Sequence, residues 1–179
     1  PFEGLDITAV QAGLADAFQN LEAQVDNDTL GKAFNEIHQK MQAAKSEQFK
    51  EAVAQGESYL ADNAKRAEIT VTDSGLQYEV LTAGTGDKPK ATSTVRTHYH
   101  GTLLDGSVFD SSYNRGEPAE FPVNGVIKGW TEALQMMPVG SKWRLHVPHT
   151  LAYGEQGAGG AIGPFSTLVF DVELLDIVA

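Results

Sequence analysis

The sequence predicts an α+β protein, in which an all-helical N-terminal region with one long helix precedes an antiparallel β-sheet wrapped on a short helix. Apolar residues over positions 1–67 recur at intervals of three and four, which is typical of amphipathic helices. From residue 74 onward apolar and polar residues alternate, which is typical of strands. Short turns and a single helical run separate these strands, which favours an antiparallel sheet over a βαβ fold. We therefore expect a helical region at 1–67, a linker at 68–73 and a sheet domain at 74–179.

Composition limits the function classes. The chain of 179 residues has a net charge of -11, which disfavours nucleic-acid binding because phosphate attraction requires a basic surface. It contains no cysteine, which excludes disulfides, thiol catalysis and thiolate metal sites. No window approaches the run of about 20 apolar residues that a membrane span needs. No signal peptide is visible, and we expect a cytoplasmic protein, with the periplasm as the alternative; because the chain starts at Pro1, we also expect a segment upstream.

The helical region is expected to contain two helices. Positions Thr8 to Asn20 form a short amphipathic pattern, and a second pattern runs from Leu30 to about Ala67 without an internal proline. The second helix would be about 60 Å long at 1.5 Å per residue, too long to bury its apolar stripe within this chain. It is therefore either a stalk or a partner for another chain. Apolar residues gathered near one end favour a partner, namely Phe18, Leu30, Phe34, Ile37 and Met41.

The strands of the second half follow in order. The first, Leu76–Val80, alternates cleanly, and Val95–Leu103 places Tyr99 on the face opposite His98 and His100. An Asp-Gly turn leads to the next strand. The remaining segments are the strand Val108–Ser112, a short helix Trp130–Met137 ended by Pro138 and Gly140, the strand Lys142–Val147 and the strand Leu168–Ile177.

Two segments do not fit regular elements. The stretch Phe121–Trp130 has few charges and is broken by Pro122 and Gly125, so an apolar chain turns sharply into a helix. Its Trp130 is either core or the floor of an apolar pocket. The segment 148–167 carries Tyr153 and five glycines, and a loop of that length in a small domain indicates function. It lacks the Gly-Lys-Ser/Thr ending of a phosphate-binding loop.

Metal chemistry is an alternative that the sequence leaves open. His98 and His100 share one strand face, His146 can share it, and three imidazoles are suitable ligands for Zn or Ni. No paired carboxylate lies at a ligand spacing near them, so we expect solvated histidines and no metal or cofactor. A Ser-His-Asp site has no supporting motif.

Five sequence blocks in order are specific enough to indicate a family. They are Val95-Arg96-Thr97-His98-Tyr99-His100-Gly101, Val108-Phe109-Asp110-Ser111-Ser112, Gly125-Val126-Ile127-Lys128-Gly129-Trp130, Leu151-Ala152-Tyr153-Gly154 and Thr167-Leu168-Val169-Phe170-Asp171-Val172-Glu173-Leu174-Leu175. Over residues 72–179 they resemble the FKBP-type peptidyl-prolyl cis-trans isomerases. The helical region resembles the bacterial macrophage-infectivity-potentiator-like branch, in architecture more than in motifs.

The resemblance implies a site and partners. It implies cis-trans isomerisation of X–Pro bonds in unfolded or partly folded proteins, a homodimer formed through the N-terminal helices, and a tacrolimus-type macrolide as a candidate inhibitor. It implies an apolar cavity walled by Tyr99, Phe109, Asp110, Val126, Ile127, Trp130, Tyr153, Ile162 and Phe170. Trp130 would be the floor under the proline ring, and the Ile127 N–H and the Tyr153 hydroxyl would donate to substrate carbonyls. Arg115 would order the Asp110 region. Ala119 and Ala158 depart from the family pattern, which bears on macrolide affinity and sequence preference.

The residues fit this chemistry. Rotation about an X–Pro bond crosses a barrier of about 18–20 kcal/mol that is set by amide resonance, so it needs no nucleophile or metal. An apolar pocket favours the less polar twisted amide, and preorganised donors can hold it. Asp110 has either a structural role beside Arg115 and Tyr99 or a direct electrostatic one. A second function remains open, in which the protein is a dimeric holdase that binds unfolded chains and isomerase activity is secondary.

Overall fold

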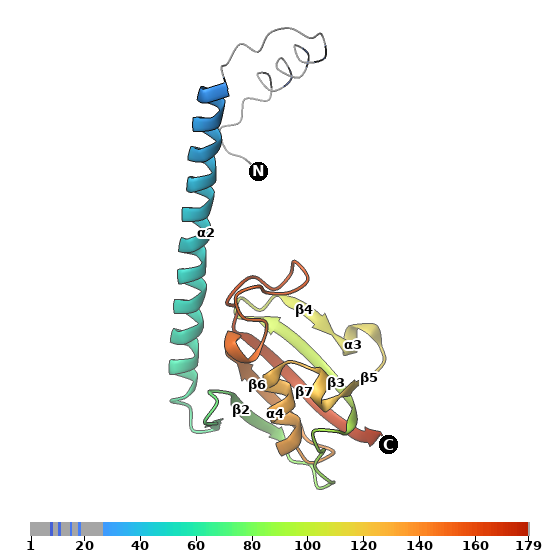
Figure 1. Ribbon diagram of the computed structural model, residues 1–179. Coiled ribbons are helices and arrows are strands. Elements are labelled where there is room, and N and C mark those ends of the chain that lie inside the picture. The colour runs from blue at the N-terminus through green and yellow to red at the C-terminus, as the bar shows by residue number, and fades with distance from the viewer. Residues whose placement is uncertain (1–7, 9–10, 12–14, 16–17, 19–26, 179) are drawn as a thin grey trace. The chain divides into compact units, whose positions relative to one another are not determined.

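The computed structural model describes residues 27–178 and, before them, positions 8, 11, 15 and 18 (Figure 1). The expected helix Thr8–Asn20 therefore lies mostly outside the described residues. The chain divides into two compact units, Pro1–Ser46 and Glu47–Ala179. The residues of the expected linker, 68–73, include the strand β1 (Ile69–Val71). The unit boundary falls earlier, so that the last part of the long helix belongs to the same unit as the sheet.

The long helix that the sequence predicts is α2 (Asn27–Asn63), of 37 residues. Pairs of opposite charge three or four residues apart support it, such as Glu36 and Lys40 at 2.9 Å and Glu47 and Lys50 at 3.6 Å. It ends earlier than the expected Ala67, because a turn follows in which the Arg66 N–H donates to the Asn63 carbonyl at 3.0 Å. No helix in the described part of the chain is long and apolar enough to cross a membrane.

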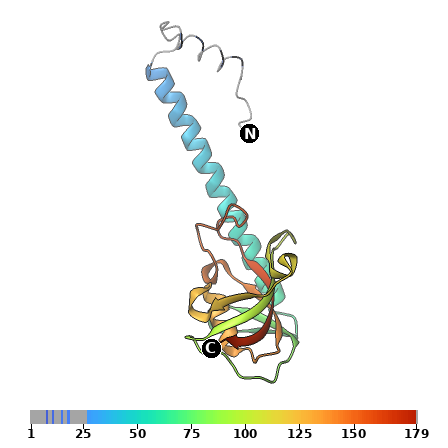
Figure 2. The same ribbon diagram turned by 90° about the vertical axis from the view of Figure 1, so that its right-hand side faces the viewer.

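The sheet of the second unit confirms the predicted α+β class. All its strand pairings are antiparallel, and the order is β1-β2-β6-β7-β3-β4, with β5 paired to β3. Figure 1 labels the strands β2 to β7, and Figure 2 shows the same ribbon turned by 90°. The central pair, β3 and β7, is in register along the whole of β3 apart from one shift between Arg96 and Thr97. Besides β1, the strands are β2 (Gln77–Thr82), β3 (Thr94–Leu103), β4 (Val108–Ser111), β5 (Ala119–Pro122), β6 (Lys142–Val147) and β7 (Leu168–Val178).

The core lies between one face of this sheet and a short helix. The helix is α4 (Lys128–Met136), close to the predicted Trp130–Met137, and it buries Trp130, Ala133 and Leu134. Alternate residues of β3 and β7 are buried beneath it, as a period of two requires. The other short elements are the helix α3 (Ser112–Arg115) and two 3-10 turns, η1 (Val123–Gly125) and η2 (His149–Leu151).

The opposite face of the sheet is covered in part by the end of α2. The described side chains of α2 are exposed as far as Gln48. Seven later positions are buried or half-buried, namely Phe49, Ala52, Val53, Gly56, Tyr59, Leu60 and Asn63. These positions recur mainly at intervals of three and four and therefore form one helix face. Gly56 permits close approach, because a Cβ atom there would lie 2.4 Å from the Thr167 hydroxyl oxygen.

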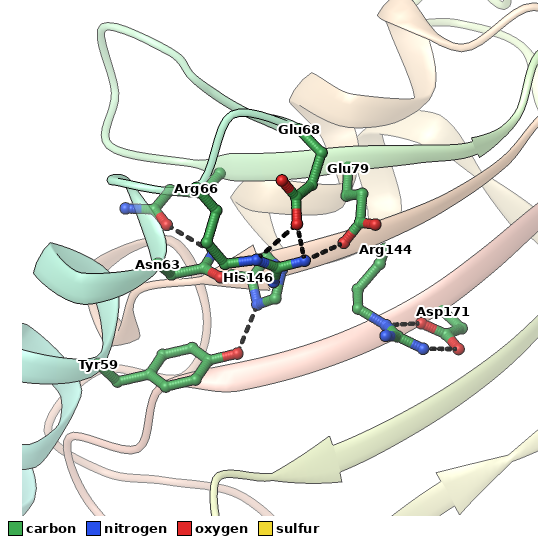
Figure 3. Close-up of polar contacts among 9 residues, drawn as sticks. Tyr59, Asn63, Arg66, Glu68, Glu79, Arg144, His146 and Asp171 are labelled. Atoms are coloured by element: carbon green, nitrogen blue, oxygen red, sulfur yellow. Dashed lines mark hydrogen bonds and ion pairs between the residues drawn. The ribbon is translucent and has the colours of Figure 1, made fainter.

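Polar contacts fix this helix end to the sheet (Figure 3). The Tyr59 hydroxyl and His146 Nδ1 are hydrogen-bonded at 2.7 Å, and the Asn63 amide donates to the Gln77 side chain at 2.8 Å. His146 does lie on this outer face, but it is 1% exposed and not solvated as expected, because α2 covers it. Among the described residues, no group of three His, Cys, Asp or Glu side chains could hold a metal ion.

The buried imidazole makes stability depend on pH. Burial, and then the charges of Arg66 and Arg144, lower the pKa of His146 to about 4. In the unfolded chain this pKa is about 6.5, so the unfolded state takes up the proton first as the pH falls. The contribution of neutral His146 to the free energy of unfolding is therefore complete above pH 6.5 and is lost as the pH falls towards 4.

We predict that His146→Gln flattens this pH dependence. One pKa unit corresponds to about 1.4 kcal/mol, so the native protein should lose about 3 kcal/mol more unfolding free energy than the variant between pH 7 and pH 4. Urea unfolding at a series of pH values measures both slopes. Parallel curves for the two proteins would show that His146 is not kept neutral by folding.

Candidate active site

A largely apolar cavity of about 600 Å³ lies between α4, the sheet and the segment 148–167. The nine wall residues expected from the resemblance all line it. They come from β3, β4, α4 with its preceding turn, the long loop and β7. Five further residues that were not predicted as wall residues also line it, namely Phe121, Gly125, Ala158, Gly159 and Ala161.

The floor of the cavity is a cluster of rings around Trp130. The indole meets Tyr99, Phe121 and Phe170 edge to face, with centroid distances of 5.3, 5.8 and 5.4 Å. This geometry places the positive edge of one ring against the negative face of the next, which is the favoured arrangement of aromatic pairs. Trp130 is only 4% exposed, so its position is fixed by packing against these rings of β3, β5 and β7.

A glycine in β3 admits another ring of the wall. Gly101 lies opposite both Asp110 and Phe170 in the sheet. A Cβ atom at Gly101 would lie 2.6 Å from the Phe109 ring, so a larger residue would displace that ring. Phe109 instead packs edge to face on Phe170 at 5.4 Å.

The carboxylate in the wall belongs to a three-residue network. The Tyr99 hydroxyl donates to Asp110 Oδ2 at 2.5 Å, Arg115 Nη1 donates to Asp110 Oδ1, and Arg115 Nη2 donates to the Tyr99 oxygen at 2.7 Å. Burial alone would raise the pKa of Asp110, but the hydrogen bonds from Tyr99 and Arg115 outweigh it and hold that pKa below its usual value. Burial, then the bond to Asp110, raise the pKa of Tyr99. The network is therefore an anionic carboxylate with a neutral phenol.

Two serines hold the Asp110 segment on β3. The Ser111 hydroxyl caps α3 by accepting from the Asn114 N–H, and it is hydrogen-bonded to His100 at 3.0 Å. Ser112 is fully buried, and its hydroxyl accepts from the Tyr99 N–H at 2.8 Å. These contacts hold Asp110 and Tyr99 in place relative to each other. His98 and His100, which the metal hypothesis named as ligands, are hydrogen-bonded to the Ser112 and Ser111 hydroxyls.

Several hydrogen-bond donors in the cavity wall have no protein partner in the described part of the chain. One is the Trp130 Nε1–H, which is buried. A second is the Ile127 N–H, because Ile127 is the N-cap of α4 and the first N–H groups of a helix have no acceptor within it. A third is the Tyr153 hydroxyl, on a side chain that is 41% exposed. The Ile127 and Tyr153 donors are free to bind a ligand, as the resemblance implies.

Two expected residues lie outside the wall. Arg115 does not line the cavity, but it donates hydrogen bonds to Asp110 and Tyr99, which do. Ala119, the first residue of β5, pairs with Thr97 of β3 and is absent from the cavity lining. Ala158 is part of the lining. Phe121 was not predicted as a wall residue. The signal was present in the sequence, because apolar Phe121 and Val123 lie two positions apart, as residues on the inner face of a strand do.

Comparison with family models covers nearly the whole chain. The model described as FKBP-type peptidyl-prolyl cis-trans isomerase matches residues 86–175. The model described as domain amino terminal to FKBP-type peptidyl-prolyl isomerase matches residues 1–80.

Individual relatives agree with these matches. The chain is 54% identical over 176 residues to the FKBP-type 22 kDa peptidyl-prolyl cis-trans isomerase of Escherichia coli (strain K12), covering 98% of this chain and 85% of that protein. It is 42% identical over 181 residues to the outer membrane protein MIP of Legionella longbeachae, covering 98% of this chain and 78% of that protein. The crystal structure of FkpA from Escherichia coli superposes with a TM-score of 0.80 at 40% identity, covering 97% of this chain and 82% of that one.

The network makes a direct prediction about the carboxylate. Replacing Arg115 by Ala removes a donor that lowers the pKa of Asp110, so that pKa should rise. Titration of the Asp110 carboxyl carbon by NMR measures it. Arg96→Ala is the matched control, because Arg96 pairs with Glu120 and not with Asp110. An unchanged Asp110 pKa in Arg115→Ala would contradict the proposed coupling.

Proposed function

The chain belongs to the family of FKBP-type peptidyl-prolyl cis-trans isomerases, and from this premise we propose how its cavity accelerates rotation about X–Pro bonds. The protein is an isomerase of such bonds. The proposal concerns the residues that bind the proline and the twisted amide. It rests on one observation, namely that a rigid aromatic floor and the unpaired Ile127 N–H and Tyr153 hydroxyl share a single cavity.

The floor binds the proline ring. The edge-to-face packing of Trp130 leaves its ring in the cavity lining, where a flat apolar surface suits a pyrrolidine ring. The surrounding aliphatic and aromatic walls exclude water from the amide. A twisted amide has lost its resonance and is less polar than the planar form, so transfer from water to this site stabilises the twisted state relative to the planar one.

The donors hold the substrate chain on either side of the rotating bond. The Ile127 N–H is fixed by the start of α4, and the Tyr153 hydroxyl is carried by the long loop. Each donates to a substrate carbonyl, so that rotation occurs about one bond while the flanking chain stays in place. Because these donors are in position before the substrate binds, little reorganisation is needed at the transition state.

Asp110 contributes mainly by position. Both of its carboxylate oxygens accept hydrogen bonds from Tyr99 and Arg115, which supports the structural role over a direct one. Its charge still faces the cavity, because Asp110 is part of the lining. It keeps the Tyr99 ring against Trp130 and thereby shapes the floor.

We predict that the native chain accelerates cis-to-trans isomerisation of a short Leu-Pro peptide and that Trp130→Ala and Asp110→Leu lose most of this activity. A loss of tenfold or more in kcat/KM corresponds to about 1.4 kcal/mol of transition-state stabilisation. Asp73→Leu is the matched control for the carboxylate, because Asp73 lies in the exposed turn before β2. A folded native chain without acceleration would overturn the proposal.

A homodimer formed through the helical region is a second part of the proposal. The described apolar side chains at Phe34, Ile37 and Met41 of α2 are 69%, 48% and 44% exposed. Their spacing of three and four places them on one face of the helix, and an exposed apolar stripe of this kind indicates an interface. A second copy of the chain would bury this stripe and present two isomerase sites to one unfolded protein.

The dimer predicts different effects on peptide and protein substrates. Phe34→Glu with Ile37→Glu should convert a dimer to a monomer in light scattering, and should lower the acceleration of refolding of a proline-limited protein. Activity on the short peptide should be unchanged, because these residues lie outside the cavity. Gln39→Glu, on the opposite face of α2, is the control. A native monomer, or equal loss on both substrates, would contradict the proposal.

A tacrolimus-type macrolide would compete with substrate for the same cavity. The apolar lining and the unpaired Ile127 and Tyr153 donors support such binding. Ala158 lies in the lining and offers less contact than a larger side chain would, which weakens that part of the interface.

A further inference from the structure

The end of α2 contacts the loop that carries Tyr153. Phe49, the first covered residue among the described side chains of this helix, packs against Phe165 with ring centroids 5.4 Å apart. Both residues belong to the same compact unit as the sheet. Phe165 lies in the segment 148–167, outside the cavity lining. The contact therefore joins the helix to the active-site loop without involving the substrate site itself.

Phe165 has an unusual backbone conformation. Its φ is +58°, and among the described non-glycine residues it alone has a positive φ. A side chain with a Cβ atom resists this left-handed region, so the surroundings must impose it. Such outliers persist where several contacts determine them together, and they gather at functional segments.

Phe165 secures both ends of the turn that carries Tyr153. Its N–H donates to the Gly154 carbonyl at 2.8 Å, directly after Tyr153. Its ring packs edge to face on His149 at 5.3 Å. The His149 carbonyl in turn accepts from the Ala152 and Gly154 N–H groups at 3.0 and 2.9 Å. Tyr153 thus lies between His149, on which the Phe165 ring packs, and Gly154, to which the Phe165 N–H donates.

The helix is fixed so that it can brace this residue. Phe49, Gly56, Tyr59 and Asn63 lie on one face of α2, and the last three contact Thr167, His146 and Gln77. Gly56 and Thr167 approach so closely that the helix cannot move towards the sheet, and the Tyr59–His146 bond fixes its rotation. The Phe49 ring is therefore held at a set position over Phe165.

We propose that Phe165, braced by Phe49, is a positioning residue that sets the orientation of the Tyr153 hydroxyl and so couples α2 to the active site. The inference rests on the donor role given to Tyr153 under the proposed function. It adds that this role depends on a helix residue outside the cavity. Loss of the Phe49 ring frees Phe165, loosens its bond to Gly154 and lets Tyr153 leave its donor position.

The test compares Phe49→Ala with Gln48→Ala in the full chain. Gln48 is the neighbouring, exposed residue of the same helix, so it controls for changes in α2 itself. Amide hydrogen exchange by NMR reads the loop directly. Phe49→Ala should accelerate exchange of the Phe165 and Gly154 amides by about fivefold or more. Gln48→Ala should leave both amides as in the native protein. Unchanged amides in Phe49→Ala would overturn the proposal.

Kinetics on the short Leu-Pro peptide then separate positioning from general loss of stability. Phe49→Ala should lower kcat/KM about threefold to tenfold, the range of one hydrogen bond, and should change the same parameter, kcat or KM, as Tyr153→Phe. Combined with Tyr153→Phe, it should have no further effect, because the two act through one hydroxyl. Additive losses in the double variant would overturn the positioning role. If Tyr153→Phe alone had native activity, the proposed donor role would fail, whatever the exchange data show for the brace.

Discussion

The edge-to-face packing of Trp130 is the constraint on which the site depends. The indole is the first large apolar side chain of α4, and it can occupy its place only if β3, β5 and β7 each supply a ring at the right angle. Packing of this kind has little freedom, because interiors are filled to crystal density and side chains lie in staggered rotamers. The cavity floor is thus a by-product of core packing, with one face of the core left uncovered. Its shape is as rigid as the fold itself.

The polar groups of the site follow from that floor. Tyr99 packs on Trp130 and at the same time donates to Asp110, so the ring that completes the floor also orients the carboxylate. Arg115 neutralises the charge from outside the cavity. The result is an apolar enclosure with donors at its edge and no group that forms a covalent bond to substrate. Such an enclosure suits a reaction in which an amide only rotates, because the change in polarity along the path is the quantity that the protein can exploit.

The sequence predicted the elements and the wall better than it predicted contacts between distant segments. Alternation located β2, β3, β6 and β7, and the family blocks identified most of the nine wall residues because those residues lie within continuous motifs. β5 was not recognised, because its four residues end at the proline of an irregular stretch and are defined by pairing to β3. The burial of His146 was not predictable from its own strand, because the alternation of that strand places His146 on the same face as the polar residues Lys142 and Arg144. It depends on Tyr59, 87 positions earlier, and no periodicity reports a contact of that kind.

The position of the unit boundary within α2 has the same origin. The change of period near residue 68 records where helix gives way to strand, but it says nothing about which unit buries a given turn of helix. From Phe49 onward the covered face of α2 fits the sheet and the long loop, and Gly56 supplies the space that this fit requires. A glycine in a helix interior costs about 1 kcal/mol relative to alanine, so its presence at the point of closest approach is explained by packing and not by helix formation. A flexible linker after the helix would leave the domain free of it. Here the end of the helix, from Glu47 onward, instead forms part of the isomerase unit and reaches the loop that carries Tyr153.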